Sequence, residues 1–244
     1  MKGAAPQVLV DHQKEWTDDL LNAVSLYGGY DKIPTDQKKK LLIHYRHDDI
    51  KEPLFRSSYC KCAFCECRPG ESGYIEVEHF APKSIYPELT FSWDNLLPVC
   101  RRCNDDKSTF DTRTTPIINP SKEDPENLLT YNMLVMQPIP DSGDEVKAKN
   151  TIEVCNLNSP RLYKARSELM VSLTEYMDNL KGKIEEISDA DTPQKKKRRI
   201  TELSNSLEIV DALLQDNSTY SGYCKWFVLQ QPIYQKAKQI IANR

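Results

Sequence analysis

Two cysteine pairs of identical C-x2-C spacing restrict the fold of this chain more than any other feature of its sequence. Cys62 and Cys65 form the first pair, Cys100 and Cys103 form the second, and 34 residues separate the two pairs. This spacing lets two thiolates from one tight turn reach a single tetrahedral ion, and four thiolates complete the closed shell of a structural zinc site. We therefore expect these four cysteines to bind one Zn²⁺. The alternative is a set of buried free cysteines.

The composition is that of a globular protein, with 39% hydrophobic and 28% charged residues. Six of the eight cysteines lie between residues 60 and 103. The N-terminus has no recognisable secretory leader, so a metal site is expected rather than a disulfide framework. No apolar run approaches the roughly 18–20 residues that span a bilayer. We expect a cytoplasmic protein that makes no membrane contact.

The net charge of −3 argues against broad coating of DNA or RNA. The net charge remains compatible with nucleic-acid binding through a small basic site inside an acidic chain. It is also compatible with a partner protein that supplies the basic binding surface.

Hydrophobic periodicity and turn residues predict an α+β fold that is mostly α. Four segments are expected: an N-terminal helical segment (1–57), a zinc-bound core (58–120), a Pro-rich and acidic connecting segment (121–158) and a C-terminal helical region (159–244).

The C-terminal region should begin with a long amphipathic helix. Ser159 is a typical capping residue, and Pro160 suits the first helical position. A polar break at 188–193 separates this helix from a second one, and a third helix should be interrupted near Pro232. The region is therefore expected to form a helical hairpin or bundle.

The zinc-bound core has the order strand, strand, helix. Residues 73–80 alternate as in a strand, 93–99 form a second strand or extended piece, and 101–109 should form a short helix that begins at the second cysteine pair. Four polar residues recur at the joints of this unit: Glu78, His79, Asn95 and Asn104.

These four residues suit phosphodiester hydrolysis, which needs an activated water and stabilised charge on the phosphate. His79 is a suitable general base. Glu78, Asn95 and Asn104 supply the oxygen ligands that an ion such as Mg²⁺ prefers. One difficulty is that successive residues of a regular strand point to opposite faces, so Glu78 and His79 share a site only if the backbone bends there. The alternative for an isolated histidine is a buried packing role.

The segments EHFAPKS, WDNLLPVC and CRRCNDDK resemble the HNH, or ββα-metal, nuclease family over about residues 60–110. Asn104 stands at the third position, which makes this an HNN variant. The resemblance implies a zinc-stapled ββα-metal core and an endonuclease that uses Mg²⁺ or Mn²⁺, with DNA as the expected substrate. In this family the middle asparagine, here Asn95, either binds the metal or braces the loop of the histidine.

The segments KCAFCE and CNLNSPRLYKAR extend the resemblance as far as Arg166. Together with the HNH segments they resemble the HNH nuclease subunit of Septu-type anti-phage systems. That resemblance implies a nucleic-acid substrate and an ABC/SMC-type ATPase as partner.

Basic residues around the core are candidates for phosphate contacts, with simple solvation as the alternative: Lys83, Arg101, Arg102 and Lys107. A rival function is a non-catalytic zinc module that binds nucleic acid or protein. A third possibility is an adaptor with a vestigial nuclease. The set of Glu78, His79 and Asn95 favours the enzyme, because a pure scaffold has no reason to assemble it.

Overall fold

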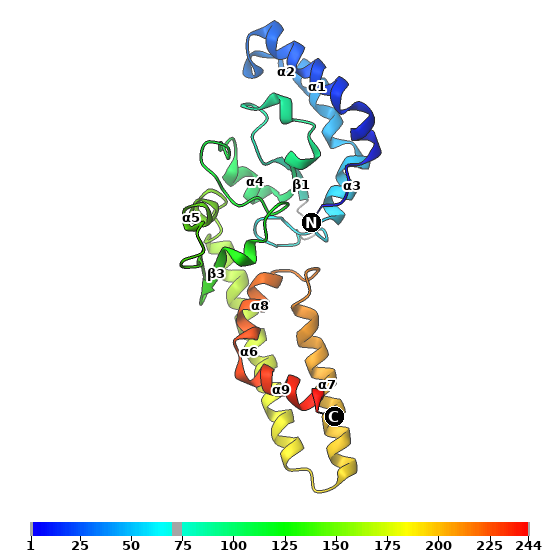
Figure 1. Cartoon of the computed structure of the whole chain (residues 1–244), viewed down its shortest axis with the longest axis vertical. Helices are drawn as coiled ribbons and strands as arrows, with labels where there is room; N and C mark the ends of the chain where they lie inside the picture. The colour runs from blue at the N-terminus through cyan, green and yellow to red at the C-terminus, as the bar shows by residue number, and fades with distance from the viewer. Residues whose placement is uncertain (1, 70–74, 244) are drawn as a thin grey trace. The chain divides into compact units, whose positions relative to one another are not determined.

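The computed structural model describes residues 2–69 and 75–243, which belong to two units (Figure 1). Unit 1 comprises Met1–Leu129 and Met136–Asn158, and unit 2 comprises Thr130–Val135 and Ser159–Arg244. Helices dominate, and the described strands form two small two-stranded sheets. The mostly helical α+β class is therefore confirmed. Within the described residues, no helix is both long and apolar enough to cross a membrane.

Unit 1 begins with helices that lead into the cysteine-rich segment. They are α1 (Gln7–Tyr27), η1 (Tyr30–Lys32, a 3₁₀ helix), α2 (Thr35–Leu42), η2 (Ile43–Arg46, also 3₁₀) and α3 (Asp48–Arg56). Gly28 ends α1 in the left-handed conformation with φ 70°. The amide of Gly29 then donates to the carbonyl of Val24 at 2.9 Å, which closes the helix end. The two glycines thus stop the helix as their position in the sequence predicts.

The predicted strand–strand–helix unit follows. β1 (Ile75–His79) pairs antiparallel with β2 (Leu96–Cys100), and the register places His79 opposite Leu96. Residues 73 and 74 of the expected first strand lie outside the described residues. Residues 93–95 form a 3₁₀ turn, η4 (Trp93–Asn95), and the second strand starts only at Leu96. α4 (Arg101–Lys107) then begins directly after Cys100.

One hydrophobic cluster joins the N-terminal helices to the strand–strand–helix unit. Leu20 of α1 and Leu54 of α3 are buried together with Phe91 and Leu96. His44 stacks on Trp16 with ring centroids 4.5 Å apart, so it has a packing role. The N-terminal segment therefore forms one core with the loop that follows β1.

The remainder of unit 1 is built from short elements. They are η3 (Pro87–Leu89), η5 (Pro125–Asn127), β3 (Leu129–Asn132), β4 (Val135–Pro138) and α5 (Glu145–Val154). The tip of the β3–β4 hairpin, residues 130–135, groups with unit 2.

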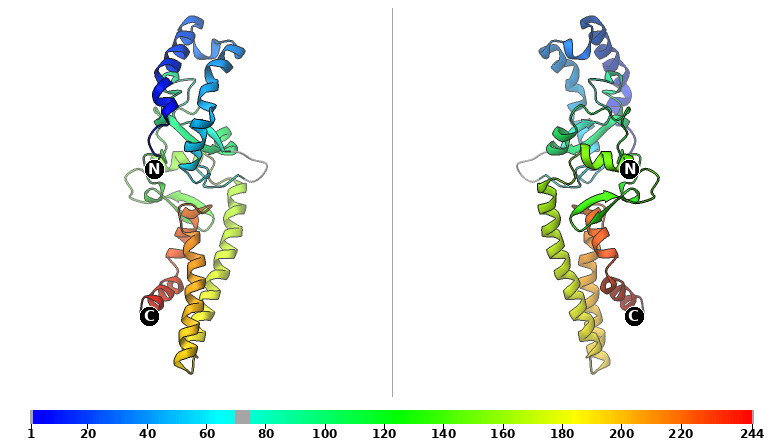
Figure 2. Two further views of the ribbon diagram at one scale, coloured as in Figure 1. Left: turned by 90° about the vertical axis from the view of Figure 1, so that its right-hand side faces the viewer. Right: turned by 90° about the vertical axis from the view of Figure 1, so that its left-hand side faces the viewer.

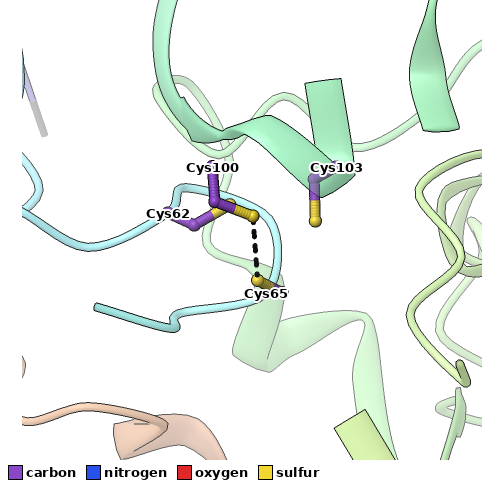
Figure 3. Close-up of side chains that lie close together, drawn as sticks. All are labelled: Cys62, Cys65, Cys100 and Cys103. Atoms are coloured by element: carbon purple, nitrogen blue, oxygen red, sulfur yellow. Dashed lines mark hydrogen bonds between the residues drawn. The ribbon is translucent and has the colours of Figure 1, made fainter. Parts of the chain in front are cut away.

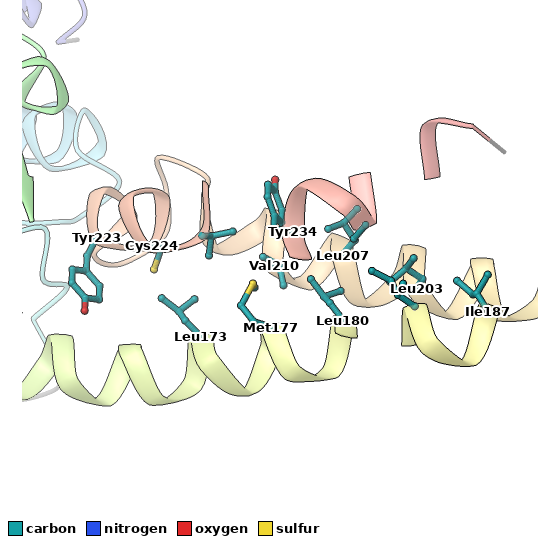
Figure 4. Close-up of a cluster of buried hydrophobic side chains, with 13 residues drawn as sticks. Leu173, Met177, Leu180, Ile187, Leu203, Leu207, Val210, Tyr223, Cys224 and Tyr234 are labelled. Atoms are coloured by element: carbon teal, nitrogen blue, oxygen red, sulfur yellow. The ribbon is translucent and has the colours of Figure 1, made fainter. Parts of the chain in front are cut away.

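Unit 2 is a helical hairpin completed by two shorter helices. Its helices are α6 (Pro160–Ser188), α7 (Pro193–Leu213), α8 (Ser221–Leu229) and α9 (Pro232–Ala242). Figure 2 shows α6 and α7 side by side as a long hairpin, and Figure 4 shows leucine, isoleucine and methionine side chains filling the space between them. The breaks before Pro193 and Pro232 fall where the sequence predicts them.

The start of α6 differs from the prediction in one detail. Pro160 is the first helical residue as expected, but the side chain of Ser159 makes no capping hydrogen bond. The amides of Leu162 and Tyr163 instead bond to the backbone carbonyl of Ser159, at 2.9 and 3.0 Å.

Candidate functional site

The four predicted zinc ligands converge at one point (Figure 3). Cys62 and Cys65 come from the turn before β1, Cys100 ends β2, and Cys103 lies in the first turn of α4. All four are buried, and their sulfur atoms lie within 4.8 Å of one another. Among the described residues this is the one group of three or more histidine, cysteine or acidic side chains close enough to hold a metal ion.

The geometry of this cluster fits a zinc ion. The Sγ atoms of Cys65 and Cys100 are 3.8 Å apart. A regular tetrahedron with Zn–S bonds of about 2.3 Å has sulfur–sulfur edges of about 3.8 Å. The amide of Ala63 donates to the carbonyl of Pro98 at 2.9 Å, which ties the first cysteine turn to β2. The sulfur donors are therefore placed by the backbone for a closed structural site.

The two further cysteines of this stretch differ from the four ligands. Cys60 is exposed, whereas Cys67 is buried beside the cluster. Neither belongs to the group of cysteines placed to hold a metal ion.

His79 ends β1 and is only 2% exposed. Its Nε2 atom lies 3.0 Å from the carbonyl oxygen of Thr90. A carbonyl can only accept, so Nε2 carries the ring proton and Nδ1 keeps a free lone pair. Nδ1 is buried and has no hydrogen-bond partner among the described residues. The backbone of the loop thus fixes the tautomer in which Nδ1 can take a proton.

The surroundings of His79 keep its ring neutral. Burial, followed by the positive charge of Lys83, lowers the pKa of His79 to about 3. His79 also lines a cavity of about 220 Å³ together with Asp31, Lys83 and Ser108. The ring is therefore neutral, with the lone pair of Nδ1 free, which is the protonation state that a general base needs before it reacts.

Asn95 braces the loop that follows His79. Its Oδ1 accepts from the amide of Ala81 at 2.7 Å, and its Nδ2 donates to the carbonyls of Ala81 at 3.0 Å and Leu89 at 3.1 Å. Both polar atoms of the buried amide are therefore engaged by backbone groups. Of the two roles open from the sequence, metal ligand or brace, these contacts favour the brace.

Glu78 and Lys107 form a buried ion pair. Lys107 Nζ lies 2.6 Å from Glu78 Oε1 and donates to the carbonyl of His79 at 3.0 Å. The pKa of Glu78 is raised by burial, which the charge of Lys107 opposes. Lys107 was a candidate for phosphate contact, but its side chain is fully buried and satisfied by these two residues. It cannot present its ammonium group to a surface phosphate without breaking this pair.

Asn104 contacts a glutamate that the sequence did not single out. Its Nδ2 donates to Glu76 Oε2 at 2.7 Å. Residues 76 and 78 share one face of β1, and residues 104 and 107 share one face of α4. The strand and the helix therefore meet through two polar contacts, Asn104 with Glu76 and Lys107 with Glu78. Glu76, Glu78 and Asn104 line one cavity.

The remaining basic candidates lie in different settings. Lys83 lines both cavities beside the site. Arg101 and Arg102 are exposed on α4, with Arg101 3.7 Å from Asp105, and neither lines either cavity. The structure therefore brings Lys83 to the site and leaves Arg101 and Arg102 on the helix surface.

Two contributors to the site carry no signal in the sequence. Thr90 acts through its backbone carbonyl, which any residue possesses. Tyr45 packs its ring against His79 with centroids 4.8 Å apart, but it comes from η2, far from the cysteine motifs.

Comparison with known proteins agrees with this geometry. Residues 62–110 match the family model "HNH endonuclease", so the chain carries an HNH domain that contains the zinc cluster and His79. The chain is also similar to the Septu protein PtuB of Bacillus thuringiensis, with 45% identity over 111 residues, which are 45% of this chain and 41% of that protein. The Septu protein PtuB of Bacillus mycoides (strain KBAB4) is 36% identical over 73 residues, or 25% of each chain. These matches span less than half the length of either relative.

Proposed function

We propose that this protein is a divalent-metal-dependent nuclease that hydrolyses phosphodiester bonds, with DNA as the expected substrate. The observation that supports this most strongly is the buried Nδ1 of His79. It is held in the proton-accepting tautomer by Thr90 and lies within a strand–strand–helix unit stapled by four cysteines. In this proposal His79 accepts the proton of the attacking water.

The oxygen donors beside His79 fit a catalytic Mg²⁺ or Mn²⁺. Glu78 and Asn104 line one cavity, and Glu76 lies beside them. Mg²⁺ takes one or two carboxylates and retains several waters, so a larger protein cage is not required. Bound there, the ion would neutralise charge on the phosphate. Lys107 orients Glu78 in this scheme, and Asn95 positions the loop of His79.

A cleavage assay tests the proposal. The full chain, loaded with zinc, is incubated with labelled single- and double-stranded DNA and RNA in Mg²⁺ or Mn²⁺. We expect cleavage that EDTA abolishes and that His79→Ala reduces on the order of 10²–10⁴-fold, without rescue by added metal. His79→Ala should keep its zinc and its nucleic-acid affinity. Cleavage by His79→Ala at the parental rate would show that another group is the base. Binding without any cleavage would favour the non-catalytic zinc module.

We further propose that the nuclease acts in anti-phage defence beside an ABC/SMC-type ATPase. The relatives named Septu protein PtuB support the defence role. A site of four thiolates requires reduced cysteines, which suits the cytoplasm. Co-purification of the chain with the proposed ATPase, followed by cleavage assays with and without ATP, tests the partnership. No association at micromolar concentrations would reject it.

A further inference from the structure

A second cavity shares Glu78 and Lys83 with the cavity that His79 lines, and it is lined in part by the N-terminal helices, which the HNH motifs do not include. Its volume is about 420 Å³. Tyr45 and Arg46 of η2 line it together with Lys83 from the loop after β1 and with Glu78 and Asn104. Segments that are far apart in the chain therefore contribute to one site.

Tyr45 links this cavity to the base. Its buried ring meets the ring of His79 edge-on, with an interplanar angle of 88°. The guanidinium of Arg46 lies 5.5 Å from the centroid of Tyr45, and Nζ of Lys83 lies 5.8 Å from it. Both distances are within the range of cation–π contact. One aromatic ring thus holds two cations close to His79.

Neither cation is held in a close ion pair by the described residues. Across residues 2–69 and 75–243, no carboxylate forms an ion pair with Arg46 or Lys83. Other cations of the same segment are paired: Lys51 with Asp48 at 2.7 Å and Arg56 with Glu52 at 2.9 Å. Two cations without a close ion pair at a cavity wall are a strong attraction for an anion.

We propose that Arg46 and Lys83 form a phosphate clamp that holds a backbone phosphate of the nucleic-acid strand in the cavity lined by Glu78 and Asn104. Arginine recognises phosphate with two parallel hydrogen bonds, and lysine adds a compact positive charge. The proposal rests on the proposed nuclease function and extends it, because it makes the end of the N-terminal helical segment part of the substrate site.

The salt dependence of binding tests the clamp independently of cleavage. Affinity of the zinc-loaded full chain for fluorescein-labelled single- and double-stranded DNA and RNA is measured by anisotropy, with Ca²⁺ replacing Mg²⁺. Each phosphate contact contributes about 0.7–0.9 to the slope of log affinity against log salt. Because the two cations share one phosphate, Arg46→Ala and Lys83→Ala should each reduce the slope by part of that amount and weaken binding about tenfold at low salt. Arg46→Lys should retain the slope.

Arg56→Ala is the matched control, because it removes an exposed arginine of the same segment that is already paired with Glu52. It should leave slope, affinity and cleavage unchanged. Zinc content and thermal midpoint are compared for all variants, and unchanged values are expected because Arg46 is exposed. If Arg46→Ala and Lys83→Ala have the same affinity and salt slope as Arg56→Ala while the parent protein binds and cleaves, the clamp proposal is wrong. The nuclease proposal is then unaffected. If the parent protein binds and cleaves none of the four nucleic acids, the nuclease proposal fails and the clamp with it.

Discussion

At the residue scale, the side chains of the site serve more than one role, and their spacing alone does not separate these roles. Glu78, His79, Asn95 and Asn104 could all be selected from the sequence, because each stands at a joint of the strand–strand–helix unit. Their partners could not be selected. From the sequence Lys107 was expected to be a surface cation, yet it is buried against Glu78. It lies one helical turn after Asn104, on the face of α4 that packs against β1.

The Glu78–Lys107 pair leads to a stability prediction. Lys107→Met leaves a buried carboxylate without its partner, which typically costs about 3–5 kcal/mol. We expect the lower end of that range, because the raised pKa of Glu78 lets the carboxyl take up a proton. Denaturant unfolding of the zinc-loaded protein measures this loss.

A matched control and a double variant complete this experiment. Lys122→Met removes an exposed lysine 3.9 Å from Asp94 and should change stability by less than about 0.5 kcal/mol. Adding Glu78→Gln to Lys107→Met should recover part of the loss, because no charge then remains buried. Equal losses of unfolding free energy for Lys107→Met and Lys122→Met would show that the buried pair contributes no more to stability than the exposed one.

Asn95 provides a second prediction at this scale, which separates the brace from the metal ligand. Asn95→Ala leaves the backbone groups of Ala81 and Leu89 without their partners, at about 1–3 kcal/mol for each buried unsatisfied group. We expect a lower thermal midpoint and a large loss of cleavage, because the loop of His79 shifts. Extra Mg²⁺ or Mn²⁺ should not restore activity. Rescue of Asn95→Ala by metal, with an unchanged midpoint, would instead identify Asn95 as a ligand.

At the element scale, the four-cysteine cluster brings together the turn before β1, the end of β2 and the start of α4. The sequence predicted the two cysteine turns and the order of the elements, because C-x2-C spacing has few structural uses. It did not predict that the second strand starts after a 3₁₀ turn. That turn places Asn95 to brace the loop after His79, and such a tertiary requirement leaves no trace in local alternation.

Zinc binding by the four cysteines is the prediction at this scale. One zinc ion per chain is expected by elemental analysis. Cys65→Ser should yield insoluble or unfolded protein, because structural zinc contributes directly to the free energy of folding. Cys60→Ser is the matched control, since Cys60 lies in the same stretch but is exposed. It should keep zinc, stability and activity. Soluble and active protein that contains no zinc would contradict the structural role.

At the scale of the whole molecule, the described residues form separate hydrophobic clusters, and the sequence predicts them unequally. The C-terminal helices were predictable because their apolar residues recur at helical spacing over many turns. The packing of the N-terminal helices against the loop after β1 was not predictable. Periodicity shows that one face of a helix is apolar, but it does not identify the element that packs against that face. Phe91 and Leu96 complete the cluster of Leu20 and Leu54 across a separation that local patterns do not encode.

Unit 2 leads to the last prediction, that its helices dock the protein onto the proposed ATPase. The hairpin of α6 and α7 has its own buried cluster, so removing it does not remove core residues of unit 1. Val171 of α6 and Ile209 of α7 are large apolar side chains that remain more than half exposed, at 56% and 53%. A protein ending at residue 158 should therefore retain zinc and the HNH core but lose binding to the ATPase.

The truncated protein needs one adjustment, because Tyr131 packs against the cluster of unit 2 and would become uncovered. Tyr131→Ser in the truncated chain removes this exposed ring, and the same substitution in the full chain controls for its own effect. Binding is measured by pull-down and by calorimetry with the purified ATPase. The double variant Val171→Asp/Ile209→Asp in the full chain should also weaken binding while leaving zinc content unchanged, since both side chains face away from the buried cluster. If the truncated protein binds the ATPase as tightly as the full chain, the docking surface lies in unit 1, and the C-terminal helices serve only their own core.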